Sequence, residues 1–296
     1  MKQIVVISGK GGTGKTTIAA SFAALSNAKV IADCDVDAPD LHLLLKPKVK
    51  QTFDFKSGKK AFINEEECIN CGECVEVCRF EAIEKIIEND VINKMIIDPI
   101  SCEGCGVCFH ICPVNAIEMR ENLTGELFIS ESKYGTLIHA KLNVAEENSG
   151  KLVSMVRNYA KHMAEKEKKN LIIIDGPPGI SCPIIASITG VDLALIVTEP
   201  TLSAMHDLDR VYKVAKHFKV RSIVCINKYD LNFENTERIK KYCKENNIDL
   251  AGNISFDPIV TEALVNGIPV VEYIDNKVSN EVKGLYNKTI SLLHYI

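Results

Sequence analysis

Two sets of residues in this sequence have the types and spacing that chemistry requires: a glycine-rich loop with two lysines, and two matching groups of four cysteines. The loop reads Gly9-Lys10-Gly11-Gly12-Thr13-Gly14-Lys15-Thr16-Thr17 and contains the pattern G-x-x-x-x-G-K-[ST]. The apolar run 4–7 precedes it and a helix-like run, 18–25, follows it, as a phosphate-binding loop requires. Glycines allow successive backbone N–H groups to face a polyphosphate at a helix N-terminus. We therefore predict that these nine residues bind a nucleotide, with Lys15 on the β- and γ-phosphates and Thr16 on Mg²⁺.

Carboxylates end two further apolar runs of the sequence. Asp33 and Asp35 follow the run 29–32, and Asp175 follows the run 171–174. Because parallel strands bring their carboxyl ends to one edge of a sheet, we expect these side chains near the glycine-rich loop. Asp175, with glycine and proline after it, is typical of the aspartate that binds Mg²⁺ and senses the γ-phosphate. The alternatives are an aspartate that caps a turn and, for the other two, a solvated surface loop.

The eight clustered cysteines form a tandem repeat with an offset of 34 residues. Each group has the spacing C-x₂-C-x₂-C-x₃-C, and the groups are Cys68, Cys71, Cys74 and Cys78, then Cys102, Cys105, Cys108 and Cys112. This arrangement resembles bacterial two-cluster ferredoxins, in which the fourth cysteine of each group crosses to the other cluster. The resemblance implies two [4Fe–4S] clusters, one held by Cys68, Cys71, Cys74 and Cys112 and the other by Cys78, Cys102, Cys105 and Cys108. Zinc bound by four cysteines is the less favoured alternative.

Lys10, directly after the first glycine, is not required by an ordinary phosphate-binding loop. With it, the loop resembles the deviant Walker A motif of the MinD superfamily, which includes ParA, the nitrogenase iron protein and Mrp-type iron–sulfur ATPases. The resemblance implies a slow ATPase that forms a homodimer on binding ATP, in which Lys10 contacts the partner's nucleotide. It also implies that Asp35 orients the attacking water or supports Mg²⁺, with Asp33 supporting Asp35. A solvated surface lysine is the alternative for Lys10.

The segment Asn227-Lys228-Tyr229-Asp230 resembles, by itself, the guanine-reading motif of GTPases. In the MinD superfamily an asparagine at this strand end contacts adenine, and a turn that corresponds to 256–258 flanks the base. The deviant loop therefore favours ATP over GTP, with Asn227, Asp257 and Pro258 among the ATP-binding residues.

Four cysteines lie outside the repeat. Cys182 lies seven residues after Asp175, and the nitrogenase iron protein has a cluster-binding cysteine at the same offset from its switch aspartate. A cluster shared between two chains needs a second cysteine from each chain, and none lies between Cys112 and Cys182. We therefore expect Cys182 to be packed or inactive in redox chemistry. The cysteines expected to be structural are Cys34, Cys225 and Cys243.

The alternation of apolar runs with helix-like segments predicts an α/β fold, a P-loop NTPase with a mainly parallel sheet flanked by helices. The cysteine groups lie in an insertion, residues 61–121, which we expect to be an α+β ferredoxin domain of the bacterial type. Residues 1–60 and 122–296 then form one discontinuous ATPase domain. The polar stretch 46–60 is expected to lie outside regular secondary structure, at the domain boundary.

The composition limits the possible classes of protein. The chain has 296 residues, of which 46% are hydrophobic and 25% charged, as in ordinary globular proteins. Its net charge of −4 gives no electrostatic basis for nucleic acid as a main partner. The first expected strand begins at residue 4, which leaves no room for a signal peptide, and no apolar run reaches the ~18 residues of a membrane span. We therefore expect a cytoplasmic protein without stable membrane anchoring.

Three functions are compatible with these motifs. The first is ATP-gated electron transfer, in which a nucleotide-driven homodimer presents two [4Fe–4S] clusters to a redox partner. The second is an assembly or scaffold ATPase for iron–sulfur or other metallocofactors, which acts on a client protein. The third is a regulatory positioning ATPase whose clusters are structural or redox-sensing. The first is the leading hypothesis; stable clusters with reversible redox chemistry would support it, and a labile, transferable cluster would support the second.

Overall fold

The computed structural model describes residues 1–27, 29–88, 91–144, 146 and 149–294, which divide into two compact units. The large unit consists of Met1–Phe53, Glu126–Leu142 and Asn148–Ile296, and the cysteine-rich unit consists of Asp54–Gly125 and Asn143–Glu147. The expected insertion, residues 61–121, lies within the second of these. Its assignment as a separate ferredoxin domain stays a prediction.

Most of a nine-stranded sheet with the order β11-β10-β9-β1-β8-β2-β7-β6-β3 belongs to the large unit. From β11 to β7 every neighbouring pair is parallel. The parallel strands are β1 (Lys2–Ser8), β2 (Lys29–Asp33), β7 (Gly135–Leu142), β8 (Leu171–Pro178), β9 (Leu193–Thr198), β10 (Arg221–Asn227) and β11 (Asp249–Ile254). Residues 4–7 of β1 have no exposed area, as expected for a strand covered on both faces. The predicted α/β fold with a mainly parallel sheet is therefore confirmed.

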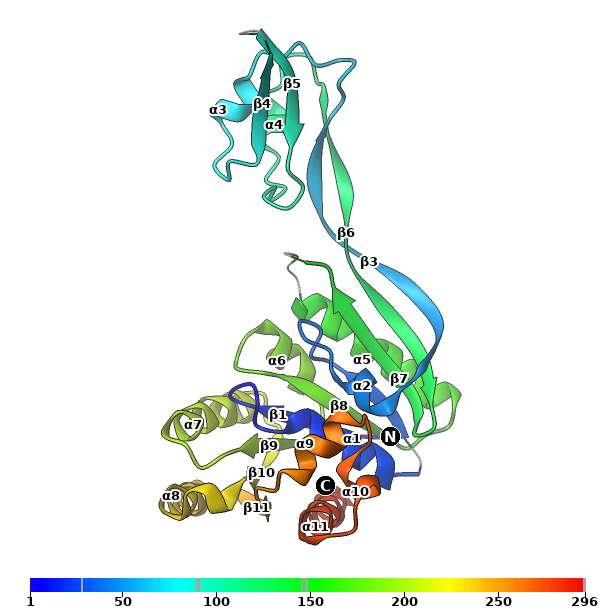
Figure 1. Cartoon of the computed structure of the whole chain (residues 1–296), viewed down its shortest axis with the longest axis vertical. Coiled ribbons are helices and arrows are strands. Elements are labelled where there is room, and N and C mark those ends of the chain that lie inside the picture. The colour runs from blue at the N-terminus through cyan, green and yellow to red at the C-terminus, as the bar shows by residue number, and fades with distance from the viewer. Residues whose placement is uncertain (28, 89–90, 145, 147–148, 295–296) are drawn as a thin grey trace. The chain divides into compact units, whose positions relative to one another are not determined.

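Helices flank both faces of this sheet (Figure 1). The helices α1, α10 and α11 pack against one another, and α5 packs against α6. The helices of the large unit are α1 (Lys15–Leu25), α2 (Leu41–Leu45), α5 (Ser149–Lys166), α6 (Cys182–Ile188), α7 (Leu202–His217), α8 (Phe233–Glu245), α9 (Ile259–Val265), α10 (Val270–Tyr273) and α11 (Lys277–His294), with a 3₁₀ turn, η1 (Tyr229–Leu231). Within the described ranges, no helix is long and apolar enough to cross a bilayer.

Strands β3 (Lys48–Ile63) and β6 (Ile117–Ser132) are neighbours at the edge of the sheet, and each contributes residues to both units. The expectation that 46–60 lies outside regular structure is therefore wrong. Of the side chains of β3, only Phe55 and Ala61 are buried, so the strand lacks the apolar alternation that would reveal it. Pairing with β6 satisfies the backbone of β3 whatever its side chains are.

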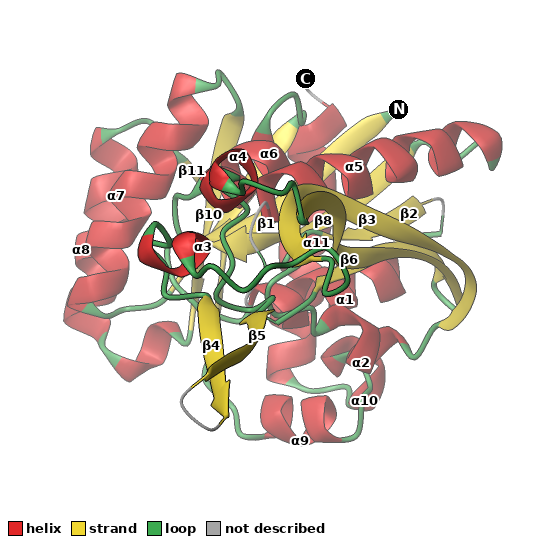
Figure 2. Cartoon of the chain, turned by 90° about the horizontal axis from the view of Figure 1, so that it is seen from above, coloured by secondary structure: helices red, strands yellow, loops and turns green. Residues whose placement is uncertain are grey.

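Two short helices and a hairpin form the cysteine-rich unit (Figure 2). Helices α3 (Glu73–Glu76) and α4 (Val107–Ile111) each follow a glycine in the left-handed region. Strands β4 (Ile83–Glu88) and β5 (Val91–Ile97) pair in antiparallel fashion. One cluster of buried residues consists of Ala61, Cys74, Ile83, Cys108 and Ile117, and Ala82, Met95 and Ala116 are buried as well. The core is therefore small, and two of its members are thiols.

Candidate functional site

The glycine-rich loop connects β1 to α1, and two glycines allow its backbone conformation. Gly12 and Gly14 have φ angles of 77° and 93°, in the left-handed region that residues with a Cβ rarely adopt. Gly9 packs against α7, where an added Cβ would lie 2.3 Å from the Cβ of Asp207. The Ser8 hydroxyl donates a 2.6 Å hydrogen bond to the backbone oxygen of Lys10. The loop is thereby held at the N-terminus of α1, the end of a helix that attracts anions.

A cavity of about 660 Å³ opens beside the loop, where β1, β2 and β8 end. Its polar lining comes from Gly11, Gly12, Gly14, Lys15, Thr16, Thr17, Asp35, Asp37, Asp40 and Ser181. Lys15 is only 5% exposed. Two buried side-chain oxygens have no hydrogen-bond partner within the described part of the chain. They are Thr13 Oγ1, in the glycine-rich loop, and Asp175 Oδ1, in β8. Since buried polar atoms normally have partners, these groups fit a ligand rich in oxygen and a cation.

Burial raises the pKa of all three candidate carboxyl groups. The pKa of Asp175 rises to about 7 because the group is buried, although Lys15 opposes the shift. Burial and the nearby Asp175 raise the pKa of Asp33 well above its usual range. Burial also raises the pKa of Asp35, and Lys15 again opposes the rise. A divalent cation would favour the ionised forms of these groups, so the site has the electrostatics that Mg²⁺ binding requires.

Asp33 positions the loop that follows β2, which contains Asp35, Asp37 and Asp40. Its carboxylate accepts hydrogen bonds from the backbone N–H groups of Asp35, at 3.1 Å, and Leu41, at 3.3 Å. It has no exposed area, and the cavity is lined by Asp35 instead. This arrangement agrees with a positioning role for Asp33, and its predicted catalytic role stays a prediction.

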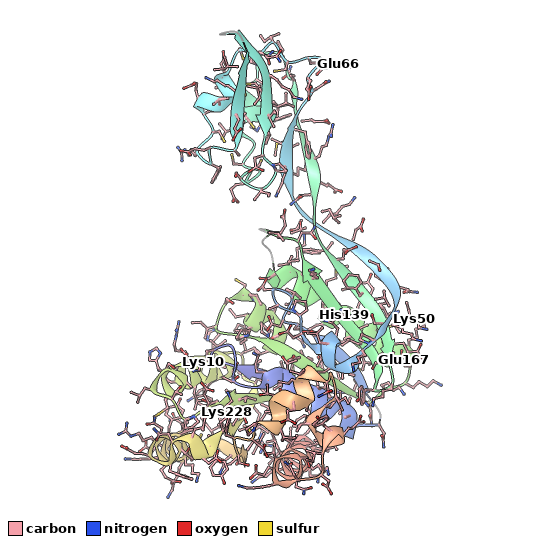
Figure 3. All side chains as sticks on the ribbon, in the orientation of Figure 1. Lys10, Lys50, Glu66, His139, Glu167 and Lys228 are labelled. Carbon is pink, nitrogen blue, oxygen red and sulfur yellow. The ribbon has the colours of Figure 1, made fainter. Side chains whose placement is uncertain are left out.

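Lys10 is held on its own chain by Glu199, the residue after β9. The Nζ of Lys10 lies 2.5 Å from Glu199 Oε1, and within 3.4 Å of the hydroxyls of Thr201 and Ser203. Glu199 Oε2 lies 3.4 Å from the Nζ of Lys228, so one carboxylate pairs with two lysines. Figure 3 labels both lysines, Lys10 and Lys228, in the large unit. Although burial opposes the shift, the contacts with the two lysines lower the pKa of Glu199. The carboxylate is therefore charged at neutral pH.

A second pocket, of about 160 Å³, has a largely apolar lining. It shares Gly12, Gly14 and Thr17 of the glycine-rich loop with the first cavity. Asn227 and Asp257 line it, whereas Pro258 is the residue that precedes α9 and is not part of the described lining. The side-chain amide of Asn227 donates a 2.8 Å hydrogen bond to the carbonyl oxygen of Thr13. The pocket is therefore attached directly to the glycine-rich loop.

Asp230, the residue that would read guanine in a GTPase, does not line this pocket as it is described. Its Oδ1 accepts a 2.8 Å hydrogen bond from the backbone N–H of Phe256, which does line the pocket. Asp230 thus positions the pocket wall, and a guanine base would lack its usual carboxylate partner there.

The cysteine-rich unit contains two pockets that each carry four cysteines. The first is lined by Cys68, Cys71, Cys74 and Cys112, and the second by Cys78, Cys102, Cys105 and Cys108. In each pocket three cysteines come from one group of the repeat and the fourth from the other group. The structure therefore brings together the same two sets that the resemblance to two-cluster ferredoxins implies, and their role as ligands stays a prediction.

In the part of the chain that the structure describes, no group of three or more His, Cys, Asp or Glu side chains is placed to hold one metal ion. Burial raises the pKa of the Cys74 thiol to about 11 and also raises that of Cys108. Without a metal these thiols are therefore protonated at neutral pH.

The other four cysteines have two kinds of environment. Cys182 begins α6 and is exposed, so it is not packed, and its inactivity in redox chemistry stays a prediction. Its seven-residue offset from Asp175 places it where the chain leaves β8, at the surface. The buried cysteines are Cys34, Cys225 and Cys243, and burial raises the pKa of each.

Sequence reasoning did not identify Glu199 or assign a role to Lys228. Glu199 directly follows a fully buried strand, which is the same signal that selected Asp33 and Asp175. Its pairing with two lysines depends on side-chain conformations, and a sequence does not reveal those.

Known proteins resemble this chain over most of its length. Residues 4–270 match the model of the CobQ/CobB/MinD/ParA nucleotide binding domain. The uncharacterized protein MJ0578 of Methanocaldococcus jannaschii is 38% identical over 290 residues, which cover 97% of this chain and 95% of that protein. An iron-sulfur cluster carrier protein of Pyrococcus horikoshii is 28% identical over 141 residues, or 43% of this chain and 47% of that protein.

The fold also resembles solved structures. The septum site-determining protein MinD of Pyrococcus horikoshii, complexed with Mg-ADP, aligns with a TM-score of 0.58 at 18% identity. The alignment covers 98% of this chain and 96% of that one. Together with the family match over residues 4–270, this agreement shows that the chain belongs to the CobQ/CobB/MinD/ParA family of nucleotide-binding proteins.

Proposed function

We propose that this chain is an ATP-hydrolysing iron–sulfur protein, in which an ATP-driven homodimer switch is coupled to electron transfer through two [4Fe–4S] clusters. The observation that carries the proposal is that a member of a nucleotide-binding family has two pockets with four cysteines each. Four thiolates complete the protein ligands of one cluster. A cluster held at all four corners is suited to carrying electrons, because no iron is left open for transfer of the cluster to a client.

The pattern of the cysteines supports a cluster more than a single metal ion. Zinc sites with four cysteines typically take them from two C-x₂-C pairs. Each pocket here is lined by three cysteines at equal steps in the sequence and by a fourth from the other group, as in two-cluster ferredoxins. Binding iron would also keep the buried thiols of Cys74 and Cys108 deprotonated.

The nucleotide half of the proposal rests on the cavity beside the glycine-rich loop. Lys15 would contact the phosphates, and Thr16, Asp35 and Asp175 would hold Mg²⁺, whose charge neutralises the phosphates when it is bound. The unpartnered Thr13 Oγ1 and Asp175 Oδ1 are the polar atoms that such a ligand would satisfy. ATP is preferred to GTP because the guanine-reading aspartate is engaged elsewhere.

Lys10 would act on the nucleotide of a second chain. On its own chain it is paired with Glu199 and does not line the described cavity. To reach a partner's phosphates its ammonium group must leave this carboxylate, which would limit hydrolysis to the dimer and keep the rate low. A cation supplied from outside at the transferring phosphoryl group typically accelerates hydrolysis by about 10³- to 10⁵-fold.

A second candidate function is that of a carrier or scaffold ATPase for iron–sulfur clusters. It is favoured by the similarity of nearly half of the chain to a protein named as an iron-sulfur cluster carrier. The two functions predict different cluster behaviour. A carrier gives its cluster to an acceptor protein that lacks one, whereas an electron-transfer protein keeps its clusters through repeated cycles of reduction and oxidation.

The test begins with protein purified without oxygen. We expect about eight irons per chain, since two four-iron clusters are proposed, and EPR signals of reduced [4Fe–4S] clusters. Cys71→Ser should remove the signal of one cluster, and the matched control Cys182→Ser, an exposed cysteine outside both pockets, should keep both. Stoichiometric zinc without a cluster signal would refute the cluster half of the proposal.

Coupling between nucleotide and clusters is tested separately. Linkage requires that ATP shifts the cluster potentials by the same free energy by which reduction changes ATP affinity, about 1–3 kcal/mol where coupling exists. Redox titrations with and without a non-hydrolysable ATP analogue measure this shift. Superimposable curves, with equal ATP affinity in both oxidation states, would show that the switch and the clusters act independently, and transfer of iron to an acceptor would favour the carrier function.

A further inference from the structure

The internal repeat allows the two cysteine pockets to be compared residue by residue. Gly72 and Gly106 are 34 positions apart, have φ angles of 83° and 77°, and immediately precede α3 and α4 (Figure 2). Each lies between the second and third cysteines of its group. The backbones of the two loops therefore match, and a difference between the pockets must come from the groups around them.

The first difference is a cation at the first pocket. A Cβ added to Gly72 would lie 3.3 Å from the Nζ of Lys85, whereas one added to Gly106 would meet no described atom within 4 Å. The position that corresponds to Lys85 in the second half of the repeat is Met119. The pocket that Gly72 lines therefore has an ammonium group against its loop, and the other has a neutral side chain at the matched position.

The ion pair of Lys85 does not cancel this charge. Glu76 Oε1 lies 2.8 Å from the Nζ of Lys85, but the side chain of Glu76 is 74% exposed and that of Lys85 is 29% exposed. Water screens the outer carboxylate more strongly than the inner ammonium group. The cysteine loop therefore experiences a net positive potential from the pair.

The second difference is a hydrogen bond to sulfur. The backbone N–H of Ala116 donates to the Sγ of Cys112, which lines the first pocket, at 3.2 Å. The matched pair in the repeat is Ala82 and Cys78, and it makes no such bond in the described part of the chain. Positive charge and hydrogen bonds to sulfur both stabilise the reduced, more negative state of a cluster.

The carboxylates in the linings and the arginine beside Cys78 do not reverse this difference. Glu73 lines the first pocket and Glu103 the second, so each pocket has one carboxylate in its lining. Arg79 follows Cys78 of the second pocket, but it is exposed, and water screens its charge. The first pocket is therefore the one that favours an electron.

We propose that Lys85 makes the first pocket, lined by Cys68, Cys71, Cys74 and Cys112, the site that holds the first electron. The inference rests on the proposed function, because it requires a cluster in each pocket. In the step concerned, the reduced cluster of the second pocket loses one electron and is oxidised, and the cluster of the first pocket gains that electron and is reduced. A one-electron donor, a low-potential redox protein or dithionite in the assay, then reduces the second pocket again. At equilibrium the first electron therefore lies on the cluster of the first pocket rather than on that of the second.

The test is an anaerobic titration of the full chain with dithionite, followed by EPR. The unmodified protein should show two potentials. Lys85→Met, which installs the residue found at the matched position, should weaken the electron affinity of the higher-potential cluster about tenfold, which is 59 mV for one electron. Glu76→Gln leaves the ammonium group unpaired and should shift the same cluster in the opposite direction by a smaller amount.

The control is Lys56→Met, which removes an exposed ion pair with Glu121 in the same unit and should leave both potentials unchanged. If Lys85→Met does not assemble its clusters, the potentials of Glu76→Gln alone test the inference. The Glu76 side chain is largely exposed, so its substitution should not disturb cluster assembly. Unchanged potentials in a variant with full iron content would overturn this inference and leave the proposed function intact. Absence of clusters from the unmodified protein would overturn the proposed function itself, and the inference with it.

Discussion

The large unit and the cysteine-rich unit are stabilised in different ways. The large unit has a continuous apolar core in which side chains such as Ile4, Phe22 and Ile173 have no exposed area. The main buried cluster of the cysteine-rich unit has five residues among those described, and Cys74 and Cys108 in it line the cysteine pockets. Because apolar burial contributes only about 25 cal/mol per Å², so small a core does not offset the entropy of ordering the chain. The large unit is therefore expected to fold through its own apolar residues, and the cysteine-rich unit through what its cysteines bind.

The largest expected effect comes from removing the cysteines that belong to both core and pockets. In the variant Cys74→Ser, Cys108→Ser, the cysteine-rich unit should lose its protected structure, because a metal-dependent fold loses its binding free energy together with its ligands. Hydrogen exchange measured by mass spectrometry should show fast exchange in β4 and β5 and unchanged protection in β1 and β8. The control is Cys243→Ser, a buried cysteine of the large unit. Full protection of β4 and β5 in iron-free protein would contradict the comparison.

The next effect separates catalysis from binding within the large unit. Lys10→Ala should keep ATP binding but lower turnover by about 10³-fold or more, because Lys10 is proposed to act only on a partner's phosphates. Lys15→Ala should weaken ATP binding by about 10- to 100-fold, as expected for loss of a charge-assisted contact of about 1.5–3 kcal/mol. Calorimetry measures binding, and phosphate release measures turnover. The weaker ATP binding of Lys15→Ala and the lower turnover of Lys10→Ala should both be seen in protein without clusters. Normal turnover of Lys10→Ala would show that Lys10 does not act on the nucleotide of a partner chain.

The sequence predicted the features that local chemistry determines. The parallel strands were visible because a strand buried on both faces is a continuous apolar run, as in residues 4–7 and 171–174. The membership of the two cysteine pockets followed from the resemblance of the repeat to bacterial two-cluster ferredoxins. Strand β3 was missed because backbone pairing, rather than apolar side chains, forms it. The pairing of Glu199 with two lysines was missed because it depends on side-chain conformations of three loops.

A smaller effect is a pH dependence confined to the large unit. Burial raises the pKa of Asp175 to about 7, above about 3.9 for an unfolded chain, so the folded protein binds this proton more tightly. The stabilisation from protonation is fully present below about pH 4 and is lost as the pH rises through about 7. Without nucleotide and Mg²⁺, hydrogen-exchange protection of β8 should therefore fall between about pH 4 and 7 and level off at higher pH, after correction for the intrinsic exchange rate.

Asp175→Asn should remove most of the pH dependence of hydrogen-exchange protection in β8. Burial also raises the pKa of Asp33, which acts in the same direction. Mg²⁺ binding needs the ionised carboxylate, so the affinity for Mg²⁺ with nucleotide should rise over the same pH range. Peptides from β4 and β5 provide the internal control, since this carboxylate belongs to the large unit. An equal slope in Asp175→Asn and in the unmodified protein would show that another group is responsible.

The smallest expected effect concerns the release of Lys10. Its ion pair with Glu199 is partly exposed, with side-chain exposures of 30% and 14%, and such pairs contribute about 1 kcal/mol or less. Glu199→Gln should weaken the hold on Lys10 and lower the protein concentration needed for ATP-dependent dimerisation by up to about fivefold. Sizing with ATP in an Asp35→Ala background, in which hydrolysis is expected to be slow enough to trap the dimer, measures this concentration. The matched control Glu237→Gln removes an exposed pair with Lys240 on α8 and should leave it unchanged. If the large unit alone forms the dimer, Glu199→Gln should change the concentration needed for dimerisation equally in protein prepared with and without iron. A change seen only in the iron-loaded protein would show that the cysteine-rich unit also controls dimerisation.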